Sequence, residues 1–314
     1  MNTETSKFVS AVIPCYNQSV FLGEAIESVL GQTHRQFEII VVDDGSSDNT
    51  SEVAARYIGV RTIRQENRGL AAARNVGLQA SSGDYLVFLD ADDRLLSNAL
   101  ECGLNSFETH PECAFVSGGC RLISGDGSHI PGVSPYIERD YYLELLRENF
   151  IWGPTTVMYR RSVLQRLGGF DSSSPGAEDY DLSLRIARSL PVHCYRDIIA
   201  ERREHGANMT RNYSLMTRST MAVFRSQRKY IKGDKAAETA YRDGLITWQY
   251  YYARKLEGGI KANLSAGDWQ RAMHNIVTLV QYCPRGLLRR LLFRLRSSLG
   301  LNTASMLPGR PKLP

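Results

Sequence analysis

Three aspartates stand within four positions where an apolar run ends, in Tyr85-Leu-Val-Phe-Leu-Asp90-Ala91-Asp92-Asp93. Carboxylates this close repel one another, so they persist where a divalent cation or a set of hydrogen-bond donors offsets their charge. A cation held by them would in turn bind a diphosphate. The alternative is a solvated turn in which one aspartate caps a helix beginning near Ser97. The short acidic motif by itself is compatible with both.

The sequence around these acids predicts alternating strands and helices. Short β-rich apolar runs indicate strands, and the amphipathic segments between them indicate helices. The strands are expected at Phe8–Pro14, Phe37–Asp43, Val60–Arg64 and Tyr85–Leu89, and the helices at Val20–Leu30, Asn49–Tyr57 and Leu70–Gln79. This alternation predicts an α/β fold with a mostly parallel, Rossmann-like sheet flanked by helices.

Polar residues collect where three of these strands end: after the first at Tyr16-Asn17, after the second at Asp43-Asp44, and after the fourth at Asp90 to Asp92. Ligands of parallel sheets bind beyond the carboxyl ends of the strands, so one shared site is expected. A dinucleotide-binding fold needs G-x-G-x-x-G after its first strand, and this chain has Pro-Cys-Tyr-Asn there. A receiver-like or phosphatase-like site would use Asp43-Asp44 but leaves the later acids unexplained.

The composition is that of an ordinary globular protein of 314 residues, with 43% hydrophobic and 23% charged residues. Its six cysteines form no C-x-x-C pair, which is typical of reduced thiols in a cytosolic protein. No leader sequence and no apolar stretch long enough to span a bilayer is recognisable, so we expect a protein that is neither secreted nor integral to a membrane. The net charge is +5, and the basic residues form no nucleic-acid-binding motif.

Five ordered blocks of the sequence resemble the inverting family 2 glycosyltransferases with the GT-A fold: Val12–Asn17, Ala25–Thr33, Glu38–Thr50, Glu66–Asn75 and Asp90–Asp93. A sixth, Arg160–Asp171 followed by Glu178–Arg185, is similar to the acceptor-side segment of that family. The resemblance covers roughly residues 7–210. It implies a GT-A catalytic domain over residues 1–212, with a nucleotide-binding half at 7–100 and an acceptor-side half at 101–212. Residues 213–314 are expected to form a helical C-terminal region.

The resemblance implies that Pro14, Tyr16 and Asp44 form the pocket for the nucleotide base. An aromatic face stacks on a pyrimidine, and a carboxylate accepts the ring N–H that uracil and thymine have and cytosine lacks. The donor is therefore expected to be a UDP- or dTDP-sugar. Arg68 and Arg74 lie beside these blocks, where a guanidinium would reach the base or a phosphate. The alternative for each arginine is a solvated surface position.

In the family pattern the first acid of the D-x-D motif contacts the donor and the last binds the cation. This assigns Asp90, with Ala91 beside it, to the donor and Asp92 to Mn²⁺ or Mg²⁺. Asp93 is expected either to join the motif or to cap the following helix. His205 matches a position that supplies a further contact to metal or diphosphate, and its alternative is packing or surface exposure.

The family's general base is an acid at the start of a helix, which here is Asp179, with Glu178 beside it. Ordinary enrichment of acids at a helix start is the alternative. Trp152 and Thr155 fall where the resemblance places acceptor-side residues, although a buried packing role is equally compatible with Trp152. The expected reaction is a direct displacement on a glycan or lipid-linked acceptor, as in the synthesis of a bacterial surface polysaccharide. The alternative is a non-catalytic GT-A protein that binds nucleotide sugar or glycan.

The last third of the sequence predicts helices over Met216–Ile231, Lys235–Leu256 and Asp268–Tyr282. Leucines and arginines then alternate at helical spacing from Leu287 to Arg296. Such a basic amphipathic helix favours contact with an anionic membrane surface through residues 285–299. Packing on the catalytic domain or on a second copy of the chain, as a homo-oligomer, are the alternatives. A cytoplasmic protein, peripheral at the inner face of the cell membrane, is therefore expected.

Overall fold

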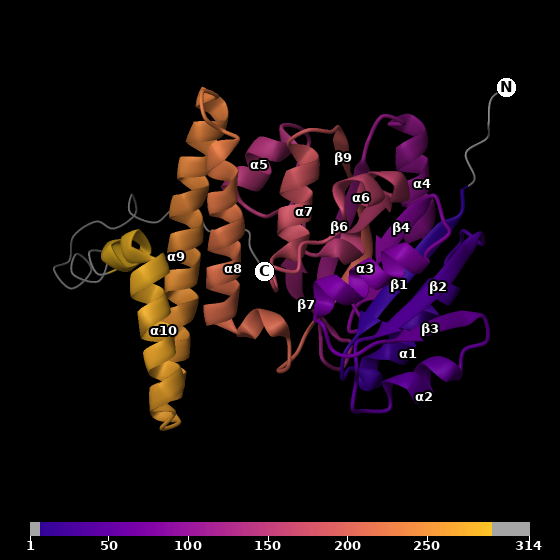
Figure 1. Ribbon diagram of the computed structural model, residues 1–314, viewed down its shortest axis with the longest axis horizontal. Coiled ribbons are helices and arrows are strands. Elements are labelled where there is room, and N and C mark those ends of the chain that lie inside the picture. Colours follow the sequence, from indigo (N-terminus) through magenta and orange to yellow (C-terminus); the bar gives the residue numbers. More distant parts are fainter. Residues whose placement is uncertain (1–6, 291–314) are drawn as a thin grey trace. The chain divides into compact units, whose positions relative to one another are not determined.

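The computed structural model describes residues 7–290 and divides them into two compact units (Figure 1). The sheet unit comprises residues 7–141 and 150–206. The helical unit comprises residues 142–149 and 207–290. All site residues expected from the sequence belong to the sheet unit. The domain boundary expected at residue 212 stays a prediction.

Among the described residues, nine strands of the sheet unit form one sheet. Along the sheet they are β3 (Val60–Arg64), β2 (Phe37–Asp43), β1 (Val9–Cys15), β4 (Tyr85–Phe88), β8 (Val157–Arg160), β6 (Phe115–Ser124), β9 (Val192–Glu204) and β5 (Arg94–Leu95), with β7 (His129–Val133) paired to β6. The first four are mutually parallel. β8 is antiparallel to both of its neighbours, and β6 and β9 are parallel. The expected parallel sheet is therefore one half of a larger mixed sheet.

The parallel half follows the apolar runs closely. β2 and β3 have the expected bounds, whereas β1 begins and ends one residue later and β4 ends one residue earlier than expected. Every residue of β1 and β4 is buried, as in strands covered on both faces. Leu89 follows β4, and its N–H still donates to Val12 O at 2.9 Å. The acidic residues from Asp90 onward therefore begin immediately beyond the sheet.

Helices of the sheet unit are α1 (Ser19–Leu30), α2 (Thr50–Ala55), α3 (Leu70–Ala80), α4 (Ala99–Thr109), α6 (Arg161–Leu167) and α7 (Glu178–Ala187), with a short 3₁₀ helix at Pro154–Thr156. Buried residues of α1 and α4 share one core with one face of the strands. On α3, a Cβ at Gly77 would lie 2.2 Å from Val12 Cγ1, so only glycine lets this helix approach β1 so closely. Close packing on β1 near the end of α3 helps to fix the position of this helix, which follows Arg68 in the chain.

The helical unit is built from α8 (Tyr213–Ser226), α9 (Lys235–Ser265) and α10 (Trp269–Tyr282), which lie side by side (Figure 1). Short 3₁₀ helices at Met209–Arg211 and Gln227–Lys229 flank α8, and residues 284–290 are helical. All three helices were expected, but α9 continues nine residues beyond Leu256. Trp248 and Tyr252 of α9 stack with ring centroids 5.6 Å apart in the interior of this unit.

One segment from the middle of the chain packs into the helical unit. α5 (Tyr141–Arg147) contributes the buried Leu145 and Leu146. On α9, a Cβ at Gly244 would lie 1.9 Å from Leu146 O, so this helix needs glycine where the two backbones meet.

Within residues 7–290, no helix combines the length and the apolar character that crossing a membrane requires. All six cysteines are free, as expected.

Candidate active site

The loops after β1 and β2 are joined by side chains at their tips. Asn17 adopts a left-handed backbone conformation, with φ 53°, which asparagine tolerates better than most residues. Its Oδ1 accepts the Ser47 N–H at 2.8 Å, and its own N–H donates to Ser46 Oγ at 3.0 Å. These bonds fix the position of the neighbouring Tyr16, whose side chain is 50% exposed. Pro14 is buried at the end of β1.

Asp43 and Asp44 have different surroundings although they are adjacent. Asp43 accepts hydrogen bonds from Ser51, Ser46 and Arg64, which outweigh the effect of burial and hold its pKa below the ordinary value. It therefore stabilises the turn after β2. The predicted base-binding residue is Asp44, which is buried at the start of the same turn.

Hydrogen-bond donors hold the Asp44 carboxylate from one side. Its two oxygens accept the backbone N–H groups of Arg68 and Gly69, each at 2.9 Å, and the side-chain amide of Gln65 at 2.6 Å. A carboxylate has about four acceptor positions, so one remains for a ligand. The Arg68 side chain is exposed. Only its backbone is placed beside Asp44, and the contact expected from its guanidinium stays a prediction.

Arg74 links the acidic motif to the start of α7. Its guanidinium is 2% exposed and donates to Asp90 Oδ1 at 2.7 Å and to Glu178 Oε1 at 3.0 Å. The Phe170 ring lies 5.2 Å from its Cζ. Burial works against the charged guanidinium, but Asp90 and Glu178 more than compensate and raise the pKa of Arg74. The solvated position considered for Arg74 is therefore wrong, and its expected contact with the donor stays a prediction.

Asp179 is the next residue of α7 and is partly exposed. Its Oδ1 accepts the N–H of Tyr180 at 2.7 Å, whereas no described residue binds Oδ2. Burial raises the pKa of Asp179 above the ordinary value, and the charge of Arg74 opposes that rise. The pKa of Glu178 is raised in the same way, because burial outweighs Arg74. A carboxylate with one open oxygen and a raised pKa has the properties of a general base.

Asp90 and Asp92 present separate carboxylates beyond β4, and Ala91 between them is buried. The side chain of Asp90 is 29% exposed. Asp92 Oδ2 lies 2.9 Å from His205 Nε2. Burial and the charge of Asp90 raise the pKa of Asp92, while His205 lowers it. The structure therefore brings His205 and Asp92 together, as the sequence predicted, although they are far apart in the chain.

Asp93 is not a helix cap, which corrects that alternative. α4 begins at Ala99 after Asn98, and β5 intervenes. Asp93 is instead buried, with one oxygen accepting the Arg203 N–H at 2.9 Å and the other accepting the Thr155 hydroxyl at 3.1 Å. Burial and the charge of Asp92 raise its pKa well above the ordinary value. Asp93 thus ties the acidic motif to β9 and to the 3₁₀ helix.

The two predicted acceptor-side residues are buried. Thr155 is enclosed beside Asp93, and its hydroxyl also receives the Asp90 N–H at 3.4 Å. Trp152 packs in the main core, in agreement with its packing alternative, and its indole N–H has no hydrogen-bond partner within residues 7–290. Thr155 thus lies behind the acids, and contact of Trp152 and Thr155 with an acceptor stays a prediction.

Sequence reasoning missed the residue that binds the acidic loop from behind. Arg203 is 1% exposed and donates to Asp92 O at 2.8 Å, to Gly125 O at 3.0 Å and to Glu24 Oε2 at 2.6 Å. The sequence signal that could have drawn attention to Arg203 is its place in the run Arg202-Arg203-Glu-His205. Only the histidine of that run was given a role, because Arg203 donates to two backbone carbonyls, and no side-chain motif encodes such contacts.

The side chains around Asp92 suit a cation that is bound partly by the protein and partly by substrate oxygens better than a cation bound by the protein alone. No group of three His, Cys, Asp or Glu side chains in residues 7–290 is arranged to enclose an ion. Mn²⁺ and Mg²⁺ commonly take only one or two protein ligands and complete their shell with water and phosphate oxygens. A carboxylate beside an imidazole, with Asp90 nearby, fits that mode of binding.

A model of the family described as glycosyl transferase family 2 matches residues 10–168. Among sequence relatives, an uncharacterized glycosyltransferase of Rickettsia felis is 31% identical over 218 residues, or 66% of this chain and 36% of the relative. The uncharacterized glycosyltransferase EpsJ of Bacillus subtilis is 33% identical over 195 residues, or 57% of this chain and 56% of the relative. The chain thus spans about a third of the first relative and about half of the second.

Solved structures show the same architecture. The S. aureus TarS fragment 1–349, crystallised with UDP-GlcNAc, has a TM-score of 0.58 at 16% identity, over 84% of this chain and 89% of that one. The mannosyltransferase PcManGT of Pyrobaculum calidifontis, with GDP-Man and Mn²⁺, has a TM-score of 0.55 at 19% identity, over 89% and 86%. At such identities the similarity shows the fold, which confirms the expected GT-A architecture.

Proposed function

Because the chain belongs to glycosyl transferase family 2, we propose that it transfers a sugar from a UDP- or dTDP-sugar to a hydroxyl group of a glycan or lipid-linked acceptor. The product would belong to a bacterial surface polysaccharide or another glycan. The observation that carries this proposal is the buried Arg74, which joins Asp90 of the acidic motif to Glu178 beside Asp179. Arg74 would thereby hold the proposed donor-binding group and the proposed proton acceptor in one site.

The surroundings of Asp44 support a uracil or thymine donor. Three hydrogen-bond donors hold its carboxylate in one orientation. The remaining acceptor position therefore has a fixed direction in which a base N–H could bind. Tyr16 offers the half-exposed ring on which a base would stack. TarS has been crystallised with UDP-GlcNAc and with UDP, which agrees with a uridine donor. In this proposal Pro14 forms the floor of the pocket, and Arg68 closes it over the diphosphate.

Asp179 would act as the general base in a direct displacement. Its Oδ2 accepts the proton of the acceptor hydroxyl as that oxygen forms a bond to the anomeric carbon. The bond from the anomeric carbon to the diphosphate oxygen breaks, the diphosphate leaves with the electron pair, and the configuration inverts. Arg74 keeps Asp179 ionised by opposing the rise in its pKa that burial causes. Glu178 holds Arg74 in place.

Asp92 and His205 would hold Mn²⁺ or Mg²⁺, with Asp90 contacting the donor sugar. When bound, the cation supplies positive charge to the departing diphosphate. PcManGT has been crystallised with Mn²⁺, which agrees with this assignment. The hydrogen bond between Asp92 and His205 keeps both groups on one side of the acidic loop, and Arg203 fixes that loop through its backbone.

Calorimetric titration with UDP, dTDP, GDP and NAD, each with and without Mn²⁺, tests the donor assignment. We expect metal-dependent binding of UDP or dTDP, and little binding of GDP or NAD. Asp44→Asn should weaken UDP binding, because an amide that turns its N–H toward the base no longer accepts. Binding of NAD in preference to UDP would refute the proposal.

Asp179→Asn tests the chemistry separately. A positioned base contributes about 10²- to 10⁴-fold, so transfer should fall by that factor while UDP binding stays unchanged. The matched control is Asp181→Asn on the same helix, where the carboxylate pairs with Arg185 instead of facing the site. An equal loss in both variants would mean that the helix, not the base, had been damaged. Wild-type protein that binds UDP and glycan without transfer would establish the non-catalytic alternative.

We also propose that the helical unit contacts an anionic membrane surface, from which the protein would take a lipid-linked acceptor. Residues 1–206 contain 19 Lys and Arg against 28 Asp and Glu, whereas residues 207–314 contain 19 against 5. Such asymmetry favours an anionic partner for the second part. It disfavours a homo-oligomer formed through these helices, because two basic surfaces would repel each other. The segment at 285–299, first expected to make the contact, lies outside the described residues from 291 onward.

α10 supplies an apolar face for this contact. Trp269, Met273, Ile276, Val277 and Val280 recur at helical spacing and are exposed, while Ala272 and Leu279 are buried on the other side. Arg271 and Arg285 flank this face and are also exposed. An exposed apolar stripe flanked by arginines is typical of a helix that lies in a membrane interface.

Sedimentation with vesicles tests this contact. We expect binding to phosphatidylcholine vesicles that contain phosphatidylglycerol, little binding to phosphatidylcholine alone, and release by salt. Met273→Ser with Val277→Ser should weaken binding by about tenfold or more, because two apolar side chains no longer enter the interface. Ile58→Ser is the control, since Ile58 is equally apolar and fully exposed in the sheet unit. Equal binding to both vesicle types would exclude the electrostatic contact.

A further inference from the structure

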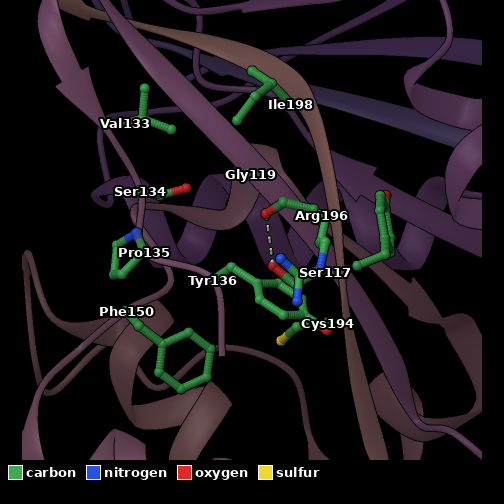
Figure 2. Close-up of a pocket in the computed structure, with 12 residues that line it drawn as sticks. Ser117, Gly119, Val133, Ser134, Pro135, Tyr136, Phe150, Cys194, Arg196 and Ile198 are labelled. Carbon is green, nitrogen blue, oxygen red and sulfur yellow. Dashed lines mark hydrogen bonds between the residues drawn. The ribbon is translucent and has the colours of Figure 1, made fainter. Parts of the chain in front are cut away.

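A small pocket lies in the sheet unit on the strands beyond the acidic motif (Figure 2). Its volume is about 200 Å³. Ser117 and Gly119 of β6 form its floor, and Cys194, Arg196 and Ile198 of β9 form one side. The segment Val133–Tyr136 and the ring of Phe150 form the opposite side. None of these residues was given a role by the sequence or by the proposed reaction.

An irregularity in the pairing of β6 with β9 opens this pocket. Ser117 pairs with Cys194, and Gly119 pairs with Ile198. Between these two pairs β9 advances by four residues while β6 advances by two, so β9 bulges out of the regular pairing. Bulges of this kind are frequent beside active sites, where they redirect side chains. A Cβ at Gly119 would lie 2.7 Å from Ile198 Cδ1 and 3.4 Å from Ser134 Oγ. Any side chain at position 119 would therefore occupy the cavity.

Direct contacts connect the pocket to the proposed transfer site. Ser117 Oγ lies 3.4 Å from Thr156 Oγ1. The preceding residue, Thr155, donates its hydroxyl hydrogen to Asp93, and its oxygen accepts the Asp90 N–H. The 3₁₀ helix at Pro154–Thr156 thus contacts the floor of the pocket through Ser117 and the back of the acidic loop through Asp93. A molecule bound in the pocket would lie close to the acids yet outside the base pocket at Asp44.

The lining combines an apolar wall, two hydroxyl groups and one cation. Pro135, Phe150 and Ile198 are apolar, while the Ser117 and Ser134 hydroxyls donate and accept hydrogen bonds. The guanidinium of Arg196 lies 4.3 Å from the centroid of the Tyr136 ring, which orients it at the rim. Among the described residues Arg196 has no ion-pair partner, so its N–H groups remain available for an anionic ligand.

We propose that this pocket is an acceptor subsite that binds one sugar ring carrying an anionic group, either a carboxylate or a phosphate. The apolar wall would contact the C–H face of the ring, the serines its hydroxyl groups, and Arg196 the anion. A volume of about 200 Å³ admits one ring and no more than short substituents. This inference rests on the proposed function, because it supplies that reaction with the class of its acceptor.

Direct binding of small probes tests the subsite without any turnover. Glucuronate, glucose 6-phosphate, glucose and inorganic phosphate would each be titrated and followed by NMR. We expect glucuronate or glucose 6-phosphate to bind at least about tenfold more tightly than glucose, because a charge-assisted bond to Arg196 is added. Whichever anionic probe binds more tightly identifies the anion. Inorganic phosphate that binds as tightly as glucose 6-phosphate would overturn recognition of the ring.

Variants locate the binding and separate it from the donor site. Arg196→Ala should weaken the anionic probe about tenfold, Arg196→Lys should weaken it less, and Arg166→Ala on the exposed side of α6 should not change it. Gly119→Val should abolish binding by filling the cavity. UDP titration of the same variants should match the wild type, which shows that they are folded. Probe binding that survives both Arg196→Ala and Gly119→Val would overturn the subsite even if UDP binds as expected.

Discussion

Two buried arginines flank the acidic loop at residues 90–93, and they contact different kinds of group. Arg74 binds the side chains of two acids, Asp90 and Glu178, which are 29% and 2% exposed. Arg203 binds two backbone carbonyls and Glu24, which is 44% exposed. One arginine therefore compensates charge inside the proposed site, while the other fixes the shape of the chain behind it.

The difference shows how a site can concentrate acids without losing the fold. Removing Arg74 would leave Asp90, Glu178 and Asp179 together without a buried cation. Removing Arg203 would take a donor from two carbonyls and from Glu24, which is partly exposed and still pairs with Arg94, so the electrostatic loss is smaller. We therefore expect the two arginines to differ in the size of their contribution to stability and in its dependence on pH.

Arg74→Met should have the largest effect on stability. Removing one partner of a buried ion pair typically costs about 3–5 kcal/mol, because the remaining charge is left unpaired. We expect a loss of that size in the free energy of unfolding near neutral pH, measured by urea denaturation. UDP binding by the folded fraction should also weaken, since Asp90 is no longer positioned.

This loss should depend on pH in a defined direction. Without Arg74 the folded-state pKa values of Glu178 and Asp179, already raised by burial, rise further above their unfolded values. Such groups destabilise the fold as pH rises through the folded pKa and cease to do so as they take up protons at lower pH. The deficit should therefore shrink on acidification. The loss in free energy of unfolding should also be smaller in the double variant Arg74→Met with Glu178→Gln. A loss that does not change with pH would mean that Arg74 does not compensate these charges.

Arg203→Met should have a smaller effect, of about 1.5–3 kcal/mol, through loss of hydrogen bonds to a charged group. Its deficit should vary little between neutral and mildly acidic pH, because the backbone carbonyls do not titrate. Arg271→Met is the control, since the pair that Arg271 forms with Asp268 is exposed, and exposed pairs contribute about 0–1 kcal/mol. If Arg203→Met showed the acid-dependent recovery expected of Arg74→Met, the proposed contrast between the two arginines would fail.

Local sequence patterns predicted the parallel half of the sheet within one residue at each strand end. Each strand there is a short apolar run, and each following loop contains polar groups that water or a ligand must satisfy. The other half of the sheet, in which strands run in both directions, was not predicted. β8, β6 and β9 meet across long stretches of sequence, and the bulge that opens the pocket near Gly119 depends on pairing between distant residues.

Recognisable sequence blocks grouped side chains that the structure brings together, and the roles of these side chains in binding and catalysis stay predictions. Asp92 lies beside His205, and Asp90 and Glu178 both form ion pairs with Arg74. A side chain that binds backbone carbonyls of other residues escaped prediction. Arg203 donates to carbonyls, and a sequence does not show which carbonyls will face an arginine. Thr155 was assigned by its place in a block, but its hydroxyl faces Asp93.

The contribution of α5 to the helical unit has a consequence for synthesis of the chain. Leu145 and Leu146 are buried there, and Gly244, where α9 meets the backbone of Leu146, follows about one hundred residues later. At about 5–20 residues per second, the ribosome needs roughly 5–20 s to make that stretch. During this time two leucines of a growing chain lack the surface that covers them. Chaperone binding to the nascent chain should therefore be strongest between the emergence of α5 and that of α9.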